Sequence, residues 1–244
     1  MTVDQIENQP IPAPGYNHAQ REPVRRILRM LLSGIGFTLL AKLDRAEGLE
    51  NIPAQGPAIL MINHISFADS LVVLHAVPRN IVPMAKIEVY NYPVVSIFPR
   101  LWGVIPVRRD EVDRRAIQQS LEVLKAGEIV LVAPEGTRGV ALQQGKEGIA
   151  YLASRSGAPV VPVAIEGTVG FPSLRGSPAW KTPGARLRFG RPFRYKAEYR
   201  RARSSDLRKM TDEAMGVLAA LLPPERRGVY AALAHATRDT LELL

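Results

Sequence analysis

The chain has 244 residues, and its 46% hydrophobic and 23% charged residues are typical of a globular protein with one large or two small domains. It contains no cysteine, which excludes disulfide frameworks, thiolate metal sites and a cysteine nucleophile. Basic residues outnumber acidic residues by 32 to 23, and the resulting net charge of +9 favours anionic lipid, acidic carrier proteins or phosphorylated substrates as partners. Only 6% of the residues are aromatic, and the sequence has no zinc-finger spacing, so nucleic acid is not an expected partner.

The N-terminal part divides into two segments. Residues 1–21 contain three prolines and few apolar residues, which predicts a disordered tail. In residues 22–48, an amphipathic helix is expected over Glu22–Leu43, with arginines opposite its apolar side. The apolar run between Arg29 and Lys42 is shorter than the ~20 residues that a spanning helix needs. We expect this helix to lie in the membrane interface, and an ordinary core helix is the alternative.

Residues 49–244 alternate short apolar runs with helical stretches, which predicts one α/β domain with a largely parallel mixed sheet flanked by helices. The expected strands are Ala58–Ile62, Ile81–Ala85, Val104–Val107, Ile129–Ala133, Val160–Ile165 and Arg186–Phe189. The expected helices are Phe67–Ala76, Val112–Lys125, Gly148–Ser156, Asp206–Leu221 and a last one within Arg227–Leu244.

A basic stretch precedes the penultimate helix. Arg186–Lys209 holds ten basic and two acidic residues. This stretch is either a solvated basic face or a contact for lipid headgroups or an acidic acyl donor.

The segment Asn63–Asp69 could carry chemistry. His64 follows a strand, at the edge where α/β sheets place their ligands. If Ser66 begins the next helix, Asp69 lies in its first turn and leans back towards His64, where its carboxylate would fix the imidazole tautomer. The alternative is structural, because Ser66 and Asp69 also match a helix capping box.

Three further segments strengthen the chemical interpretation. Gly103–Arg109 reads GVIPVRR, Pro134–Arg138 reads PEGTR, and Val161–Val163 reads VPV. Together with Asn63–Asp69, which reads NHISFAD, they follow the order of four motif blocks in the glycerolipid acyltransferases. From about Leu49 to Gly190 the sequence resembles that family, in particular its 1-acylglycerol-3-phosphate acyltransferases.

The resemblance implies that His64 is the general base that deprotonates the acceptor hydroxyl, and that Asp69 orients it. A thioester donor has a good leaving group, so neither a covalent intermediate nor a cofactor is expected. Acyl-CoA or acyl carrier protein would be the co-substrate.

The resemblance also implies binding residues. Arg109 and Arg138 would bind the acceptor phosphate, because a guanidinium forms paired hydrogen bonds with phosphate. Gly136 and Thr137 could offer backbone donors, and Glu135 could hold an arginine or the glycerol hydroxyl. A local salt bridge across the turn is the structural alternative for Glu135–Arg138.

Four other residues complete the predicted site. Asn63 and Ser66 belong to the first block, and Pro162 would line the acyl site from a buried strand. Lys86 could contact donor or acceptor phosphate, or it could simply be solvated.

The expected function is therefore transfer of a fatty acyl group to the free hydroxyl of a lysophospholipid on the cytoplasmic face of the cell membrane, by a peripheral or monotopic protein. Lysophosphatidic acid is the leading acceptor. Ala133 and Gly139 stand where the family often has Phe and Ser, which leaves other acceptors open, for example a lyso-ornithine lipid. A non-catalytic basic protein that binds membranes or nucleic acid is the alternative from another class.

Overall fold

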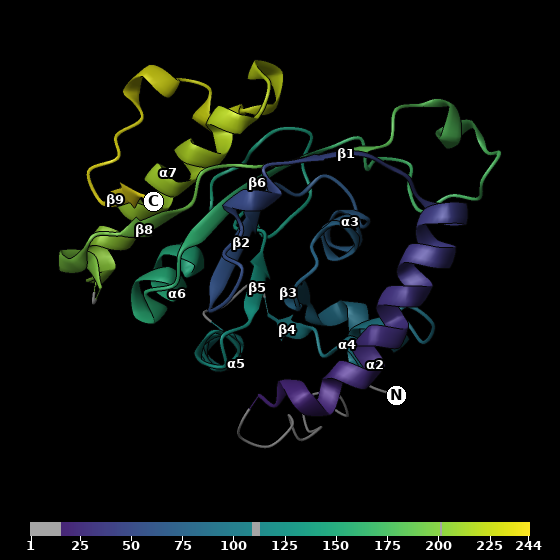
Figure 1. The fold of residues 1–244 in the computed structure, drawn as a ribbon. Coiled ribbons are helices and arrows are strands. Elements are labelled where there is room, and N and C mark those ends of the chain that lie inside the picture. Colours follow the sequence, from purple (N-terminus) through teal and green to yellow (C-terminus); the bar gives the residue numbers. More distant parts are fainter. Residues whose placement is uncertain (1–15, 109–112, 201) are drawn as a thin grey trace.

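The computed structural model describes residues 16–108, 113–200 and 202–244. Among these residues nine strands form one sheet, with β1-β7-β6-β2-β5-β3-β4 in spatial order and with β8 and β9 added beside β6 (Figure 1). The strands are β1 (Leu43–Glu47), β2 (Ala58–Ile62), β3 (Ile81–Lys86), β4 (Ile105–Val107), β5 (Ile129–Val132), β6 (Val160–Glu166), β7 (Ala185–Phe189), β8 (Phe193–Tyr195) and β9 (Leu241–Leu243).

The sheet is mixed but largely parallel, as the sequence predicts. The central strands β2, β5 and β6 are parallel, and β7 runs antiparallel to β6. β2 is buried along its whole length, which explains why it reads as an uninterrupted apolar run. The single α/β domain expected from the sequence is confirmed.

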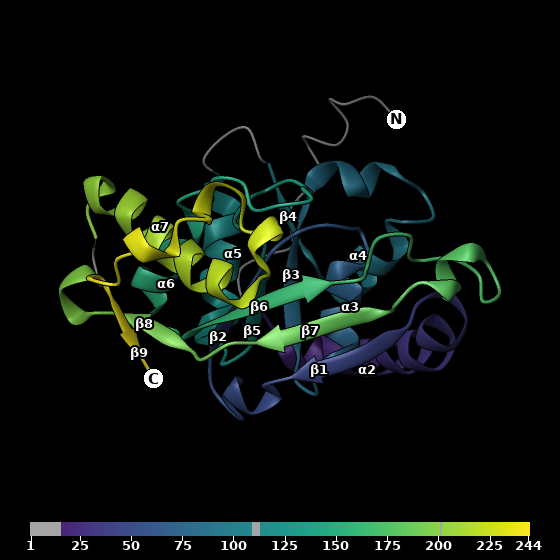
Figure 2. The ribbon, with the colours of Figure 1, turned by 90° about the horizontal axis from the view of Figure 1, so that it is seen from above.

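Helices cover both faces of the sheet (Figures 1 and 2). One apolar core joins one face to α5, α6 and α7, and a second core joins the other face to α3 and α4, with α2 packed beside them. The helices are α2 (His18–Leu31), α3 (Asp69–Ala76), α4 (Ile97–Trp102), α5 (Arg114–Lys125), α6 (Gly148–Ser156) and α7 (Ser204–Leu221).

The N-terminal segments differ from the expectation at their boundaries. Helix α2 begins at His18, capped by the Asn17 side chain, so the last four residues of the expected tail are helical; residues 1–15 lie outside the described part of the chain. The helix continues as a π-helix, η1 (Leu32–Leu40), and then ends. The expected helical region 22–48 is wrong beyond this point, because residues 43–47 gain ladder hydrogen bonds as strand β1 beside β7.

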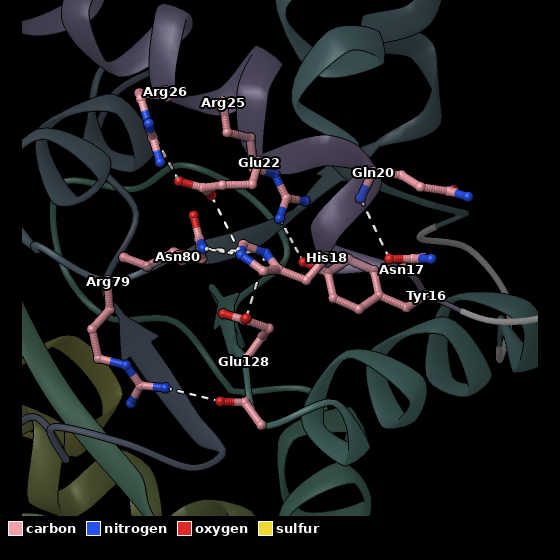
Figure 3. A network of polar contacts seen from close by, with 12 residues as sticks. Tyr16, Asn17, His18, Gln20, Glu22, Arg25, Arg26, Arg79, Asn80 and Glu128 are labelled. Atoms are coloured by element: carbon pink, nitrogen blue, oxygen red, sulfur yellow. Dashed lines mark hydrogen bonds and ion pairs between the residues drawn. The ribbon is translucent and has the colours of Figure 1, made fainter.

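Helix α2 is tied to the domain by polar contacts (Figure 3). The buried side chain of Arg25 donates from Nε to the Trp102 carbonyl at 2.8 Å and from Nη1 to the Tyr16 hydroxyl at 2.5 Å. His18 lies 3.4 Å from a carboxylate oxygen of Glu22 and also of Glu128. Helix α2 is thus part of the folded domain, and no helix among the described residues has the length and apolar character to cross a bilayer.

The C-terminal segment is not the helix that the sequence predicts. Residues 224–235 form three short 3-10 turns, and residues 241–243 form β9 against β8. The buried carboxylate of Glu213 accepts hydrogen bonds from the Thr237 and Thr240 hydroxyls and from the backbone N–H groups of Asp239 and Thr240. These contacts hold the segment in an irregular path across α7. Hydrophobic periodicity within the segment cannot predict such a path, because the contacts are made to a distant residue.

Candidate active site

The site begins where β2 ends. The side chain of Asn63 extends the ladder between β2 and β6, since it donates to the Ile165 carbonyl at 3.0 Å and accepts from the Ile165 N–H at 2.7 Å. The backbone is therefore free to turn out of the sheet at His64. Helix α3 begins at Asp69, not at Ser66, because residues 66–68 form a turn first.

His64 and Asp69 are in direct contact. The Nδ1 atom of His64 lies 2.8 Å from Oδ2 of Asp69, whose side chain is fully buried. The same oxygen accepts from the Ile65 and Ser66 N–H groups at 2.7 and 2.8 Å, and Oδ1 accepts from the Thr168 hydroxyl at 2.5 Å. An ionised carboxylate only accepts, so Nδ1 of His64 carries the hydrogen and Nε2 keeps a lone pair.

Glu135 holds the same loop from another side. Its Oε1 atom accepts from the His64 N–H at 3.1 Å, and its Oε2 atom accepts from the Gln143 N–H at 2.8 Å. Burial raises the pKa of Glu135 above its ordinary value, and the two backbone hydrogen bonds oppose part of that rise. The structure thus gives Glu135 backbone partners in place of the expected arginine or hydroxyl.

A cavity of about 630 Å³ opens beside His64. It lies between the sheet and helices α5 and α6, and much of its lining is apolar. The apolar lining residues are Ile62, Met84, Ala85, Val107, Ala116, Ile117, Leu131, Val132, Ala133, Ile149 and Leu152. A cavity of this size and character suits a flexible hydrocarbon chain.

The same cavity has a cationic part. Four basic side chains line it, against two acidic ones: Lys86, Arg108, Lys146 and Arg208 against Asp113 and Glu147. Lys86 also lies 2.7 Å from Glu88. Arg208 is likewise paired with Asp212, so part of the positive charge of the lining is balanced by neighbouring carboxylates.

Sequence reasoning did not single out Arg208 or Thr168. Arg208 comes from α7, and its only signal is its place in the basic stretch Arg186–Lys209. Thr168 follows β6 and has no recognisable motif around it.

Of the other residues predicted for the site, some line the cavity and others do not. Gly136 lines the cavity, and its φ of +67° is a conformation that favours glycine. Thr137 and Arg138 are exposed and lie outside the cavity lining of the described residues. Arg109 lies outside the described part of the chain.

Ser66 and Pro162, two of the residues predicted to contact substrate, form hydrogen bonds within the fold. Ser66 is buried, and its hydroxyl donates to the Thr168 carbonyl and accepts from the Ala68 N–H. Pro162 is buried inside β6 and lies outside the cavity lining of the described residues. Its carbonyl instead accepts from the Gly190 N–H, which secures the chain after β7.

The fold and the site together define a class of protein: an α/β domain with a histidine bonded to a buried carboxylate at the edge of the sheet, beside a cavity lined by apolar and charged side chains. A family model described as Acyltransferase matches residues 45–166, which is half of the chain. The chain belongs to the acyltransferase family.

Individual relatives agree with this assignment. The chain is 33% identical over 129 residues to a chloroplast 1-acyl-sn-glycerol-3-phosphate acyltransferase of Arabidopsis thaliana, covering 50% of this chain and 35% of that protein. It is 31% identical over 128 residues to the 1-acyl-sn-glycerol-3-phosphate acyltransferase of Borreliella burgdorferi, covering 51% of each. The chain thus spans about half or less of the length of these relatives.

A solved structure is similar over most of the chain. The 1-acyl-sn-glycerophosphate acyltransferase of Thermotoga maritima superimposes with a TM-score of 0.59 and 27% sequence identity. The match covers 90% of this chain and 85% of that one, so it includes elements on both sides of the family region.

Proposed function

We propose that this protein is an O-acyltransferase that transfers a fatty acyl group from an acyl thioester to the free hydroxyl of a lysophospholipid. The observation that carries the proposal is the contact of 2.8 Å between His64 and Asp69 beside the apolar cavity. Lysophosphatidic acid is the leading acceptor, because the relatives described above are named for 1-acylglycerol-3-phosphate. Phosphatidic acid would be the product.

The reaction needs one base and one leaving group. Nε2 of His64 takes the proton from the acceptor hydroxyl as its oxygen bonds to the thioester carbonyl carbon. The C–S bond then breaks, and the thiolate leaves and takes the proton back from the imidazolium. Asp69 stabilises that imidazolium and keeps the ring oriented. The thioester is already activated, so the scheme calls for no cofactor.

The two parts of the cavity suggest how substrates are held. The apolar lining accepts a fatty chain, and the basic side chains Arg108 and Lys146 of the lining bind the phosphate. Both acyl-CoA and acyl carrier protein present an anionic carrier at the thioester, so either donor agrees with the basic lining. The expected site of action is the membrane surface, where the acceptor resides.

Thiol release from acyl-CoA tests the proposal, with and without lysophosphatidic acid, in the wild type and in His64→Ala. The variant is expected to lose about 100- to 10,000-fold in rate, since a general base supplies that factor. Because His64 is half-buried and lies outside both cores, the variant should remain folded. Wild-type turnover in His64→Ala would contradict the mechanism.

A panel of donors and acceptors defines the substrate. If acyl-CoA with lysophosphatidic acid gives no release, acyl carrier protein and other lysolipids, including lyso-ornithine lipid, are tested next. A blank across the whole panel would favour a non-catalytic membrane-binding protein.

A further inference from the structure

Residues 92–101, which we name the α4 arm, carry an unusual set of exposed apolar side chains. The arm consists of the turn before α4 and all of that helix except its last residue, Trp102. Its exposed residues are Tyr92 (62%), Val94 (80%), Val95 (41%), Ile97 (54%) and Leu101 (45%). Clustered exposure of this kind marks an interaction surface, because soluble proteins rarely leave large apolar patches uncovered.

The backbone at the tip of the arm is already hydrogen-bonded within the arm. The Ser96 N–H donates to the Tyr92 carbonyl at 2.8 Å, and the Ile97 N–H donates to the Val94 carbonyl at 3.3 Å. The Ser96 hydroxyl donates to the Pro93 carbonyl at 3.2 Å. Unpaired backbone groups are costly in hydrocarbon, so these hydrogen bonds lower the cost of placing the tip in lipid.

The arm lies against helix α2 (Figure 1), where the buried Arg25 bonds the carbonyl of Trp102 at the end of α4. Helix α2 and η1 expose further apolar side chains: Val24, Ile27, Met30, Leu31, Ile35 and Leu39. We name these six residues and the five of the arm the insertion surface. Two elements that are distant in sequence and packed against each other thus both carry exposed apolar side chains.

The charges around the insertion surface favour an anionic bilayer as its occupant. The arm contains no acidic residue, and its one charged side chain, Arg100, is exposed. Arg26 on α2 is also exposed. Apolar side chains with arginines beside them match the acyl boundary and the anionic headgroups of a membrane.

The arm is also close in sequence to the active-site cavity. It follows Lys86 by way of the short helix η3 (Ile87–Asn91), and Lys86 lines the cavity. The arm is thus joined through η3 to strand β3, whose last residue borders the cavity.

We propose that the α4 arm inserts into an anionic bilayer as a second membrane contact beside α2. The biological purpose of this contact rests on the proposed function, which needs a lipid acceptor. Membrane binding itself is measured independently of catalysis.

The test is sedimentation with vesicles of phosphatidylcholine and phosphatidylglycerol in equal parts. Val94→Asp is expected to lower the partition coefficient about tenfold or more, because one buried valine supplies that factor. Val229→Asp is the matched control, since Val229 is 68% exposed and lies in the 3-10 turn η7 (Gly228–Tyr230), which packs against α7 and not against the arm. Its vesicle binding is expected to equal that of the wild type.

Tyr92→Ser is a second variant in case Val94→Asp fails to fold, and circular dichroism checks both. Equal vesicle binding by the wild type and by a folded arm variant would overturn the proposal. So would a wild-type dimer in lipid-free buffer that Val94→Asp separates, because a second copy would then cover the arm. Thiol release in detergent micelles, assayed in parallel, is expected to be unchanged in the arm variants. If the wild type released no thiol in micelles, that result would contradict the proposed function but not the membrane contact of the arm.

Discussion

The carboxylate of Asp69 bonds both to the backbone of the turn before α3 and to the His64 ring. The sequence left open whether this residue caps a turn or orients His64, and the structure shows both contacts on the same oxygen. The hydroxyl of Thr168 binds the other oxygen, so the side chain has little freedom to rotate. In the proposed mechanism, a carboxylate held in this way keeps His64 oriented before substrate binds.

Replacing Asp69 with Asn tests the orienting role. The amide has one acceptor oxygen in place of two, and its NH2 group would face hydrogen-bond donors, which favours the wrong histidine tautomer. We expect Asp69→Asn to lower kcat about 100- to 10,000-fold. Thr168→Val removes a single hydrogen bond to Asp69 and is expected to cost about tenfold or less. Steady-state thiol release measures both, and an unchanged kcat in Asp69→Asn would remove Asp69 from the mechanism.

Glu135 provides a pH-dependent prediction. Its pKa is raised above the ordinary 4.5, chiefly by burial, so the folded protein holds this proton more tightly than the unfolded chain does. Charge on Glu135 therefore costs stability as the pH rises through the raised pKa. We expect the unfolding free energy of Glu135→Gln to improve relative to the wild type as the pH rises above the ordinary value of 4.5, until the carboxyl is ionised in the folded protein too.

Urea denaturation across this pH range measures the difference. Glu225→Gln, at an exposed glutamate, is the matched control and is expected to show a much smaller trend. A difference for Glu135→Gln that stays constant with pH would contradict the assigned cause.

At the level of elements, α7 and the C-terminal turns hold the loop that borders the cavity. Arg208 donates to the Gly145 carbonyl at 2.8 Å and is paired with Asp212. The Tyr230 hydroxyl accepts from the Gly145 N–H at 3.1 Å and donates to Asp212 at 2.9 Å. Both backbone groups of Gly145 are thus fixed by the same cluster, next to the cavity-lining Lys146.

Removing the Tyr230 hydroxyl tests this arrangement. Tyr230→Phe deletes two hydrogen bonds, so we expect KM for the acceptor to rise about three- to tenfold while kcat changes little. Tyr199→Phe, on a half-buried tyrosine of the 3-10 turn η5 (Ala197–Tyr199), is the matched control. An equal effect in both variants would indicate general destabilisation.

The sequence predicts the central elements well because each is a buried apolar run bounded by turn residues. Strand β2 and helix α6 match their expected bounds. β8 and β9 have only three residues each, and they exist because they pair with each other and with β6. Such short strands form only because distant segments pair with them, so the local sequence pattern does not predict them.

The same distinction holds within the site. The contact between His64 and Asp69 follows from five residues of spacing and the geometry of a helix start. Thr168 lies 99 residues after Asp69, and Arg208 lies on a helix beyond the matched family region. Their approach is decided by the order of strands in the sheet, which local spacing does not reveal.

At the scale of the whole molecule, the N-terminal helix and the α/β domain share one folded unit. Arg25 is fully buried between Tyr16 and Trp102, and its guanidinium lies 5.5 and 5.9 Å from their ring centroids. Helix α2 is thus fixed in orientation relative to the rest of the domain.

Arg25→Ala tests this coupling. The change leaves the Trp102 carbonyl without its partner and opens a cavity, so we expect a loss of about 1–3 kcal/mol in the free energy of unfolding. Arg26→Ala, at an exposed neighbour, is expected to cost less than about 0.5 kcal/mol. Tryptophan fluorescence and circular dichroism should report one coincident transition. Two separate transitions would show that the helix is an independent appendage.

The exposed position of the insertion surface has a consequence for how the reaction rate should scale. A protein seated in the bilayer meets a lipid acceptor by lateral diffusion in two dimensions. Its rate then follows the mole fraction of acceptor in the bilayer, not the amount of acceptor per volume of solution. Adding buffer to saturating vesicles should leave turnover unchanged, whereas adding inert phospholipid at constant acceptor should lower it in proportion to the surface dilution.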